Sequence, residues 1–203
     1  RQRKGTGAFL YTGTPGNGGS MQSLGTLGGQ ESSASAINDA GQIVGEAQAS
    51  NGIYKAFLYA NGTMYNLGSL GNADSESVAH DINSYGHIVG SSELGPDDGW
   101  ARRAFLYTGT PGVDGQMINL DAWLDEVNPV EGAKWVLTEA YGINDSGLIV
   151  GYGSYYNGVS WATRAFLLDA STIIPEPSSL LLVLAGAVGL MRRRRLLNEE
   201  QPN

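Results

Sequence analysis

The sequence predicts an all-β fold, a β-propeller-like array of four-stranded repeats followed by one C-terminal hydrophobic helix. Glycine is the outlier of the composition, with 30 of 203 residues, and it supplies the positive φ that tight turns between short strands require. Three short phrases recur in a fixed order, and one uncharged apolar run stands near the end of the chain. We expect about three units to be visible and the array to be incomplete at its N-terminal end.

The recurring phrases define the units, because self-similarity at a fixed period is the signature of repeat architectures. They lie at residues 8–11, 56–59, 104–107 and 165–168 for AFLY and its variant AFLL; at 37–45, 82–90 and 143–151 for INDAGQIVG and its variants; and at 24–29 and 67–72 for LGTLGG and its variant. We predict a repeat domain over residues 1–170. Its units are expected at about 8–55, 56–103 and 104–168.

Each unit is expected to form four short strands. In the second unit these lie at residues 55–59, 63–67, 77–83 and 87–91. Asn61 and Gly62 are typical of a hairpin turn between the first two strands. Four strands in about 45 residues is the period of a β-propeller blade. The Ala, Phe, Ile and Val residues that recur at matching places are expected to pack between neighbouring units.

The third unit carries an insertion. Its apolar residues Leu120, Trp123, Leu124 and Val127 have the spacing of one helical face, and Pro129 ends the pattern. We predict a short helix there, followed by a strand around residues 135–141. An atypical unit beside the end of an array is usually a cap, so we expect the chain to be the last part of a longer array.

These phrases resemble the HAF-repeat family of exported bacterial proteins over residues 7–168. The histidine of the family's His-Ala-Phe triplet is absent from every copy, and Gly7, Lys55, Arg103 and Arg164 take its place. We therefore expect no ligand role at that position. The resemblance implies an extracellular, propeller-like repeat domain in a family without an established biochemical role.

The sequence contains few side chains of the kinds that enzymes commonly use for catalysis. We predict no catalytic residue, no metal site and no cofactor. His80 and His87 are the only histidines, the side chains that titrate near pH 7. His80 adjoins Asp81 and stands near Ser75 and Ser77, which suggests a Ser/His/Asp arrangement. The slot of His87 holds Gln or Leu in the other units, so strand surface is favoured over a triad.

Acidic pairs are expected to form turns. Asp97 and Asp98 in Pro-Asp-Asp-Gly offer oxygens for calcium, but their spacing matches no calcium loop and the tetrapeptide favours a turn. Asp39 and Asp145 are likewise interpreted as turn formers, because Ser84 replaces them in the second unit.

The net charge argues against nucleic acid as a partner. Residues 1–174 contain 8 Lys and Arg against 17 Asp and Glu, a net charge of −9. Nucleic-acid binding requires a basic face, so we expect no nucleic-acid partner. Cysteine is absent, which excludes disulfides and thiol chemistry.

Aromatic side chains are the candidate ligand-binding residues. Trp100, Tyr155, Tyr156 and Trp161 are expected in turn-rich connections between units, where their faces could stack on sugar rings. The alternative is that these rings cover the hydrophobic edges of the blades.

The run IPEPSSLLLVLAGAVGLMRRRR of residues 174–195 is a marginal membrane anchor. Its 14 apolar and uncharged residues, Ser178 to Met191, would extend about 21 Å as a helix, against a hydrocarbon core of roughly 30 Å. A core helix is the competing interpretation. A basic cluster orients the segment with its charge in the cytoplasm and the repeats outside; it consists of Arg192, Arg193, Arg194 and Arg195.

The same run resembles the PEP-CTERM sorting signal of Gram-negative bacteria, also labelled an ice-binding-protein C-terminal domain. Pro175, Glu176 and Pro177 carry the motif, although eight further residues follow the arginines. The resemblance implies export, transient membrane tethering and recognition by an exosortase-type membrane transpeptidase. We predict a linker with the sorting motif at 171–179, a transmembrane-type helix with the basic cluster at 180–195, and a disordered tail at 196–203.

Together these observations predict an exported, surface-processed repeat protein, a non-catalytic binding or matrix component associated with exopolysaccharide at the cell surface. One alternative is an extracellular carbohydrate-active enzyme on a propeller scaffold, with acidic residues supplying the carboxylates. Another is a membrane-anchored structural protein.

Overall fold

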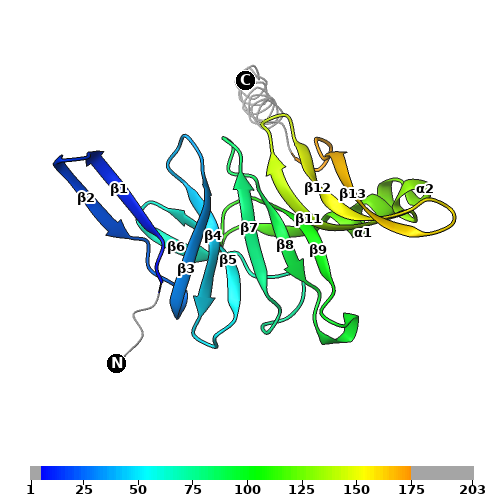
Figure 1. The fold of residues 1–203 in the computed structure, drawn as a ribbon, viewed down its shortest axis with the longest axis horizontal. Coiled ribbons are helices and arrows are strands. Elements are labelled where there is room, and N and C mark those ends of the chain that lie inside the picture. The colour runs from blue at the N-terminus through cyan, green and yellow to red at the C-terminus, as the bar shows by residue number, and fades with distance from the viewer. Residues whose placement is uncertain (1–5, 175–203) are drawn as a thin grey trace, which may run out of the picture. The chain divides into compact units, whose positions relative to one another are not determined.

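A computed structural model describes residues 6–174 of the chain, and strands dominate them (Figure 1). The all-β prediction is confirmed. The predicted helix and basic cluster of residues 180–195 and the tail of residues 196–203 lie outside the described residues. The elements are β1 (Phe9–Thr14), β2 (Asn17–Ser23), β3 (Gly28–Ile37), β4 (Ile43–Ala49), β5 (Tyr54–Ala60), β6 (Thr63–Asn66), β7 (Ser77–Ile82), β8 (Ile88–Glu93), the 3-10 helix η1 (Pro96–Asp98), β9 (Arg102–Thr108), β10 (Gln116–Asn119), α1 (Leu120–Val127), α2 (Pro129–Gly132), β11 (Trp135–Ile143), β12 (Leu148–Tyr156) and β13 (Trp161–Asp169).

Antiparallel strands that follow one another in the chain form four sheets. The sheets are β1-β2, β3-β4-β5-β6, β7-β8-β9-β10 and β11-β12-β13. Hairpin connections make this order natural, since an antiparallel neighbour can be reached through a short turn. Within residues 6–174 the sheets do not close into a propeller.

The sheets are out of phase with the predicted units. The four strands expected in the second unit form as β5 to β8, but β5 and β6 end one sheet whereas β7 and β8 begin the next. The connection over residues 67–76, LGSLGNADSE, adopts turns and irregular backbone instead of a tight hairpin. Each of the three larger sheets therefore starts at the strand before an Ile-Asn turn, and the sheets that end in β2 and β6 end just before a Leu-Gly phrase.

Apolar side chains of the repeats pack between adjacent sheets, as predicted. One cluster joins the β3–β6 and β7–β10 sheets; it contains Val44, Ala56, Leu58, Leu67, Ala79, Ile82, Ile88, Phe105 and Tyr107. A second cluster joins the β1–β2 hairpin to the β3–β6 sheet; it contains Ala8, Leu24, Ile43, Ala47, Phe57 and Tyr59. Burial of such side chains, at about 25 cal/mol per Å² of apolar surface, stabilises each joint.

The recurring glycine of the Ile-Val-Gly phrase makes room for the recurring phenylalanine. Gly90 pairs with Phe105 across β8 and β9. A Cβ at Gly90 would lie 2.0 Å from the Val78 carbonyl oxygen and 2.8 Å from Cζ of Phe105. A Cβ at Gly151 would meet the Phe166 ring in the same way, at 2.6 Å. Close backbone approach therefore explains why both phrases recur together.

The insertion of the third unit contains the predicted helix and strand. Asn119 caps α1, its side-chain oxygen accepting hydrogen bonds from the backbone N–H groups of Asp121 and Ala122. Leu120 is fully buried, at the place that Leu67 occupies in the preceding sheet. Pro129 ends the predicted helix and starts α2, because proline fits the first helical turn but not a helix interior.

Candidate functional site

The Ile-Asn turns of successive sheets are hydrogen-bonded to one another. Within its own turn, the side-chain oxygen of Asn83 accepts from the backbone N–H groups of Tyr85 and His87. Asn38 Nδ2 donates to the Asn83 carbonyl oxygen at 3.0 Å, and Asn83 Nδ2 donates to the Asn144 carbonyl oxygen at 3.2 Å. We call these two bonds the asparagine ladder. They fix the spacing of the three turns.

The asparagines, and not the aspartates beside them, form these turns. Asp145 instead accepts from the backbone N–H and the hydroxyl of Ser84 in the neighbouring turn, at 3.0 and 2.7 Å. Its role therefore lies between turns, whereas the sequence predicted a role within one.

A β-bulge recurs in the first strand of each larger sheet. The pairing register shifts at Ser35, His80 and Tyr141, so each stands as an extra residue against the neighbouring strand. Bulges re-aim side chains. The rings of His80 and Tyr141 lie 4.7 Å apart, and those of Tyr141 and Tyr152 lie 5.8 Å apart. A row of partly exposed rings thus crosses from β7 to β12.

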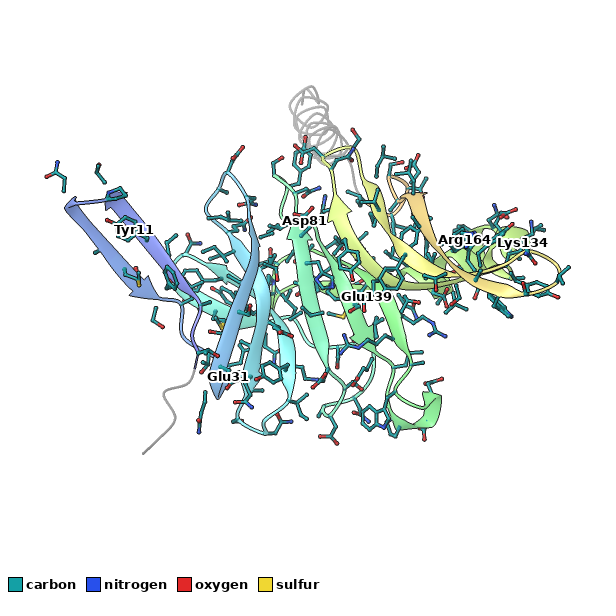
Figure 2. The ribbon with its side chains drawn as sticks, viewed as in Figure 1. Tyr11, Glu31, Asp81, Lys134, Glu139 and Arg164 are labelled. Atoms are coloured by element: carbon teal, nitrogen blue, oxygen red, sulfur yellow. The ribbon has the colours of Figure 1, made fainter. Side chains whose placement is uncertain are left out.

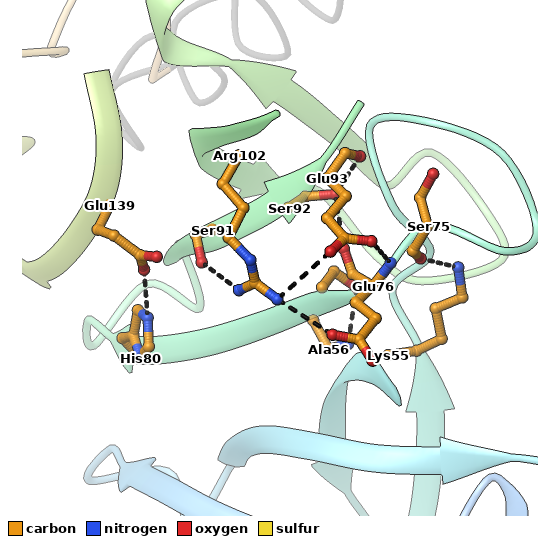
Figure 3. A network of polar contacts seen from close by, with 11 residues as sticks. Lys55, Ala56, Ser75, Glu76, His80, Ser91, Ser92, Glu93, Arg102 and Glu139 are labelled. Carbon is orange, nitrogen blue, oxygen red and sulfur yellow. Dashed lines mark hydrogen bonds and ion pairs between the residues drawn. The ribbon is translucent and has the colours of Figure 1, made fainter. Parts of the chain in front are cut away.

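Polar contacts involve His80, the first ring of this row, and charged side chains of nearby strands (Figure 3). His80 Nε2 lies 3.0 Å from Oε2 of Glu139 on β11. Arg102 on β9 donates to Ser91 Oγ at 3.3 Å and to Glu76 Oε2 at 3.2 Å, and it lies 3.9 Å from Glu93. His80 lies on β7 and Glu139, labelled in Figure 2, lies on β11, which belongs to a different sheet. The network therefore links sheets that share no backbone ladder.

Glu46 and Glu139, which both feel the charges of His80 and Arg102, have pKa values shifted in opposite directions. Burial raises the pKa of Glu46, and the charge of Glu76 raises it further against the charges of Arg102 and His80. Burial opposes ionisation of Glu139 as well, but hydrogen bonds from His80 and Ser91 and the nearby charges outweigh it and lower the pKa. Burial thus decides the direction of the pKa shift at Glu46, whereas hydrogen bonds and charges decide it at Glu139.

The Ser/His/Asp arrangement that the sequence suggests does not assemble. Asp81 accepts from the backbone N–H of Ile143 at 2.9 Å. Ser77 bridges Ala56 N–H and the Gly68 carbonyl, and Ser75 hydrogen-bonds within the loop at Asn72. These groups hold backbone in place, and His80 bonds to Glu139 instead.

His87 and the acidic pair of Asp97 and Asp98 also occupy structural positions. His87 Nδ1 lies 3.2 Å from Asn83 Nδ2, and burial lowers the pKa of His87 against the charge of Asp145. Asp97 and Asp98 belong to η1, a turn closed by Gly99 in a left-handed conformation. Among residues 6–174, no group of three or more His, Cys, Asp or Glu side chains could hold a metal ion.

The structure separates the four candidate aromatic residues. Tyr155 and Tyr156 lie in β12 and Trp161 begins β13, so the expectation that they lie in connections between units was wrong for these three. Long strands extend through this region because its aromatic residues favour strand backbone. Tyr155 packs on Trp135 at 4.8 Å, whereas Tyr156 and Trp161 form a pair at 5.3 Å with their planes 39° apart. Trp100 lies in the loop after η1.

Two of the four residues that replace the histidine of the triplet, Lys55 and Arg103, hold neighbouring segments through their charged side chains. Lys55 Nζ donates to Ser69 Oγ at 3.1 Å, to the Asn72 carbonyl at 3.3 Å and to the Ser75 carbonyl. Arg103 pairs with Asp121 at 2.8 Å. An open depression of about 530 Å³ adjoins Lys55, but the ammonium group already has three oxygen partners there.

Sequence reasoning missed the network around Arg102 and Glu139. Its one signal is a charged residue at a place that is uncharged in the other units, since Glu139 occupies the position of Ser33 and Val78. Pairing of that residue with His80, 59 residues away, depends on how the sheets stack and has no local signature.

Comparison with known proteins gives two matches within the chain. Residues 28–124 match a family described as a protein of unknown function (DUF3466), a stretch that spans β3 to α1 and both four-stranded sheets. Residues 174–195 match the PEP-CTERM protein-sorting motif. No curated protein and no solved structure matches the chain. The resemblance to HAF repeats stays a prediction.

The matched motif contains Pro175, Glu176, Pro177 and the arginines from Arg192 to Arg195, all outside the described residues. In residues 6–174 we find no helix with the length and hydrophobicity needed to cross a bilayer. PEP-CTERM signals are processed by exosortase, a membrane enzyme. The chain therefore carries the signal of an exported protein that is sorted through exosortase toward the cell surface.

Proposed function

We propose that this chain is a surface-processed bacterial repeat protein whose sheets act as a non-catalytic binding or matrix module for extracellular polysaccharide. In this proposal the tail tethers the protein to the membrane until exosortase acts at Pro175 to Pro177. The repeat domain then remains at the cell surface or is released.

The Tyr156–Trp161 pair is the observation that carries the binding role. The rings stand 5.3 Å apart on adjacent strands, and Trp161 is 53% exposed. Tyr and Trp offer large, rigid faces with a polar group at one end, at a low cost in conformational entropy. Two such rings side by side suit the alternating apolar faces and hydroxyl rims of a sugar chain.

The arrangement of successive sheets supports a HAF-type, propeller-like array. β7 packs across β3, β4 and β5, and β11 packs in the same way across β7, β8 and β9. These two sheets thus pack their first strands against the preceding sheet, and the successive stacking of similar antiparallel sheets suits the repeated blades of a propeller. The division into a repeat domain, a linker and a tail belongs to the same proposal.

Affinity electrophoresis of the full chain through gels that contain exopolysaccharide tests the binding role. Trp161→Ala and Tyr156→Ala should abolish retardation, because each removes half of the platform. Trp100→Ala is the matched control, an exposed tryptophan at the equivalent place in the preceding unit that lacks the tyrosine neighbour, and it should leave retardation unchanged. Equal retardation of wild type and Trp161→Ala would refute the proposed platform.

One observation favours the enzyme alternative, the raised pKa of Glu46 beside the charge of Glu76. Glycoside hydrolysis uses a carboxyl group of raised pKa together with a second carboxylate. Reducing ends released from polysaccharide by wild type, and lost in Glu46→Gln, would establish this alternative. Binding without release of reducing ends supports the non-catalytic module.

Replacement of Pro175, Glu176 and Pro177 by alanine tests the tethering step. The variant should remain in the membrane fraction at its unprocessed mass, whereas wild type is cleaved. Unchanged processing would refute the role of these three residues. Wild type that stays uncleaved in the membrane would instead favour the membrane-anchored structural protein.

A further inference from the structure

The open depression beside Lys55 has a polar lining without a carboxylate. The turn between β4 and β5, the start of β5 and the segment that follows β6 form its walls. Its volume of about 530 Å³ lies in the range of sites that hold small molecules. No aspartate or glutamate is among the lining residues that the structure describes. The polar ones are Ser50, Asn51, Lys55, Asn66, Ser69 and Asn72.

Three asparagines of this lining have their side-chain amides fixed in the same way. In Asn51, Asn66 and Asn72, Oδ1 accepts a hydrogen bond from the backbone N–H two residues later, at 3.2, 2.8 and 2.9 Å. Because a backbone N–H requires an acceptor, these bonds establish which end of each amide is the oxygen. The other end of each amide is therefore a hydrogen-bond donor.

These donors have little to bind within the chain. Asn51 Nδ2 reaches the Ala73 carbonyl oxygen at a long 3.4 Å. Within residues 6–174, no acceptor takes a hydrogen bond from Nδ2 of Asn66 or of Asn72, and both residues are exposed. The depression thus offers N–H groups to a ligand.

The loop that carries Asn72 is held in place before any ligand binds. Leu70 N–H donates to Ser92 Oγ at 2.8 Å, and Asn72 N–H donates to Ser75 Oγ at 3.0 Å. A Cβ at Gly71 would lie 2.2 Å from the Leu94 carbonyl oxygen, so the backbone approaches its neighbours closely here. Donors that are already ordered bind a ligand at a lower cost in conformational entropy.

A buried cation lies beneath these donors. Lys55 is 5% exposed, and its ammonium group donates to three neutral oxygens, one of them the Ser75 carbonyl (Figure 3). In the part of the chain that the structure describes, no carboxylate lies within 4.0 Å of that group. Arg103, at the equivalent place in the next unit, pairs with Asp121 at 2.8 Å.

More distant carboxylates compensate this cation only in part. Burial lowers the pKa of Lys55, and the charges of Asp74, Glu93 and Glu76, which raise it, do not outweigh burial. Buried charges are stabilised when an opposite charge is close. An anion in the depression would supply that charge.

We propose that this depression binds the carboxylate of an acidic sugar, a uronate residue of the polysaccharide. A carboxylate only accepts hydrogen bonds, so it suits a site of N–H donors above a cation. Lys55 acts through its charge, because its three N–H groups already have acceptors. The identification of the source as a polysaccharide rests on the proposed function, whereas the preference for a carboxylate rests on the residues of the depression.

The acidic character of the whole domain does not oppose this assignment at short range. Residues 1–174 have a net charge of −9, but exposed charges farther away than about 8 Å are largely screened at physiological ionic strength. The groups that line the depression therefore decide which ligand it takes.

Isothermal titration calorimetry of the full chain with tri-galacturonate tests the site. Asn66→Asp keeps the oxygen that accepts from the Gly68 N–H, removes the amide donor and adds a negative charge. It should therefore weaken binding by about tenfold or more, and Asn72→Asp should act in the same way. Asn61→Asp is the matched control, because it makes the same change at an exposed turn residue at the opposite end of the β5–β6 hairpin. Its affinity should equal that of wild type, and circular dichroism should show all three variants folded.

The ligand side of the contact has its own controls. The methyl ester of the same trisaccharide has no carboxylate and should bind about tenfold or more weakly. Equal binding of acid and ester, undiminished binding by both Asn66→Asp and Asn72→Asp, or no binding by wild type would overturn the proposal. Binding of inorganic phosphate alone that Asn66→Asp removes would assign the depression to free anions and would overturn the sugar as its ligand.

Failure of this proposal and failure of the proposed function give different results. Trp161→Ala should bind tri-galacturonate as wild type does, because the Tyr156–Trp161 pair belongs to another sheet. Wild type that binds tri-galacturonate but passes unretarded through exopolysaccharide would refute the proposed function alone. Retardation without binding of tri-galacturonate would refute the assignment of the depression alone.

Discussion

Replacing Ser77 with alanine tests how the sheets are joined where no backbone ladder connects them. Ser77 Oγ accepts from the backbone N–H of Ala56 at 2.9 Å and donates to the Gly68 carbonyl at 2.5 Å. The same bridge recurs at Ser32, which bonds to Ala8 N–H and the Gly25 carbonyl. Because Ser77 is buried, water cannot replace the lost hydroxyl without a rearrangement.

The magnitude follows from the two groups left without a partner. A buried donor or acceptor that loses its hydrogen bond costs about 1–3 kcal/mol. Ala56 N–H is fully buried, whereas Gly68 is partly exposed and recovers some hydration. We therefore expect Ser77→Ala to lower the free energy of unfolding by about 2–4 kcal/mol, with little contribution from the small cavity.

Urea denaturation followed by circular dichroism measures the loss, and amide hydrogen exchange locates it at Ala56. Ser35→Ala is the matched control, since Ser35 is an exposed serine of the equivalent strand β3. It should change stability by less than about 0.5 kcal/mol. A loss for Ser77→Ala no larger than that of the control, with Ala56 exchange unchanged, would refute the bridging role.

Three further predictions concern the sheets and their glutamates. Gly90→Ala should lower the free energy of unfolding, measured in urea, by at least about 2 kcal/mol, because its Cβ would lie 2.0 Å from a backbone oxygen. Gly7→Ala is the control and should be nearly neutral, because the atom nearest to its Cβ is 3.8 Å away. Equal effects of the two substitutions would contradict this packing. Glu46 has a raised folded-state pKa, so its ionisation costs stability as pH rises above its unfolded value. Glu46→Gln should therefore raise Tm by about 1–3 °C at pH 7 but not at pH 3.5, and a pH-independent gain would count against it. Glu139 has a lowered pKa in the folded state, so the stability that its charge contributes is present above the unfolded pKa and is lost as pH falls through the folded pKa. Glu139→Gln should therefore lower the free energy of unfolding at pH 7, and progressively less toward pH 3. A loss that does not change with pH would exclude the charge as its origin.

The sequence predicted the strands well, because turn residues and recurring apolar phrases are local signals. The strands expected at 55–59, 63–67, 77–83 and 87–91 correspond closely to β5, β6, β7 and β8. The helix that begins at Leu120 was found for the same reason, since its apolar spacing and Pro129 lie within one short segment.

Local sequence patterns did not predict which strands pair with one another or which residues meet in the candidate site. Whether β6 pairs with β7 depends on the path of residues 67–76, where buried Lys55 and Ser77 hold the loop. The His80–Glu139 contact and the Tyr156–Trp161 pair need the register of strands far apart in sequence. The predicted aromatic group therefore contained residues that the fold places on different surfaces.

The asparagine ladder bears on how such a chain can change in length over evolution. Asn38 and Asn83 are 45 residues apart. The side-chain amide of each donates a hydrogen bond to the following turn, and the backbone carbonyl of each stands where the amide of a preceding turn would donate. Duplication or loss of one such segment in frame would join a donor to an acceptor of the same kind. Copy number can then vary without compensating substitutions at the new junction.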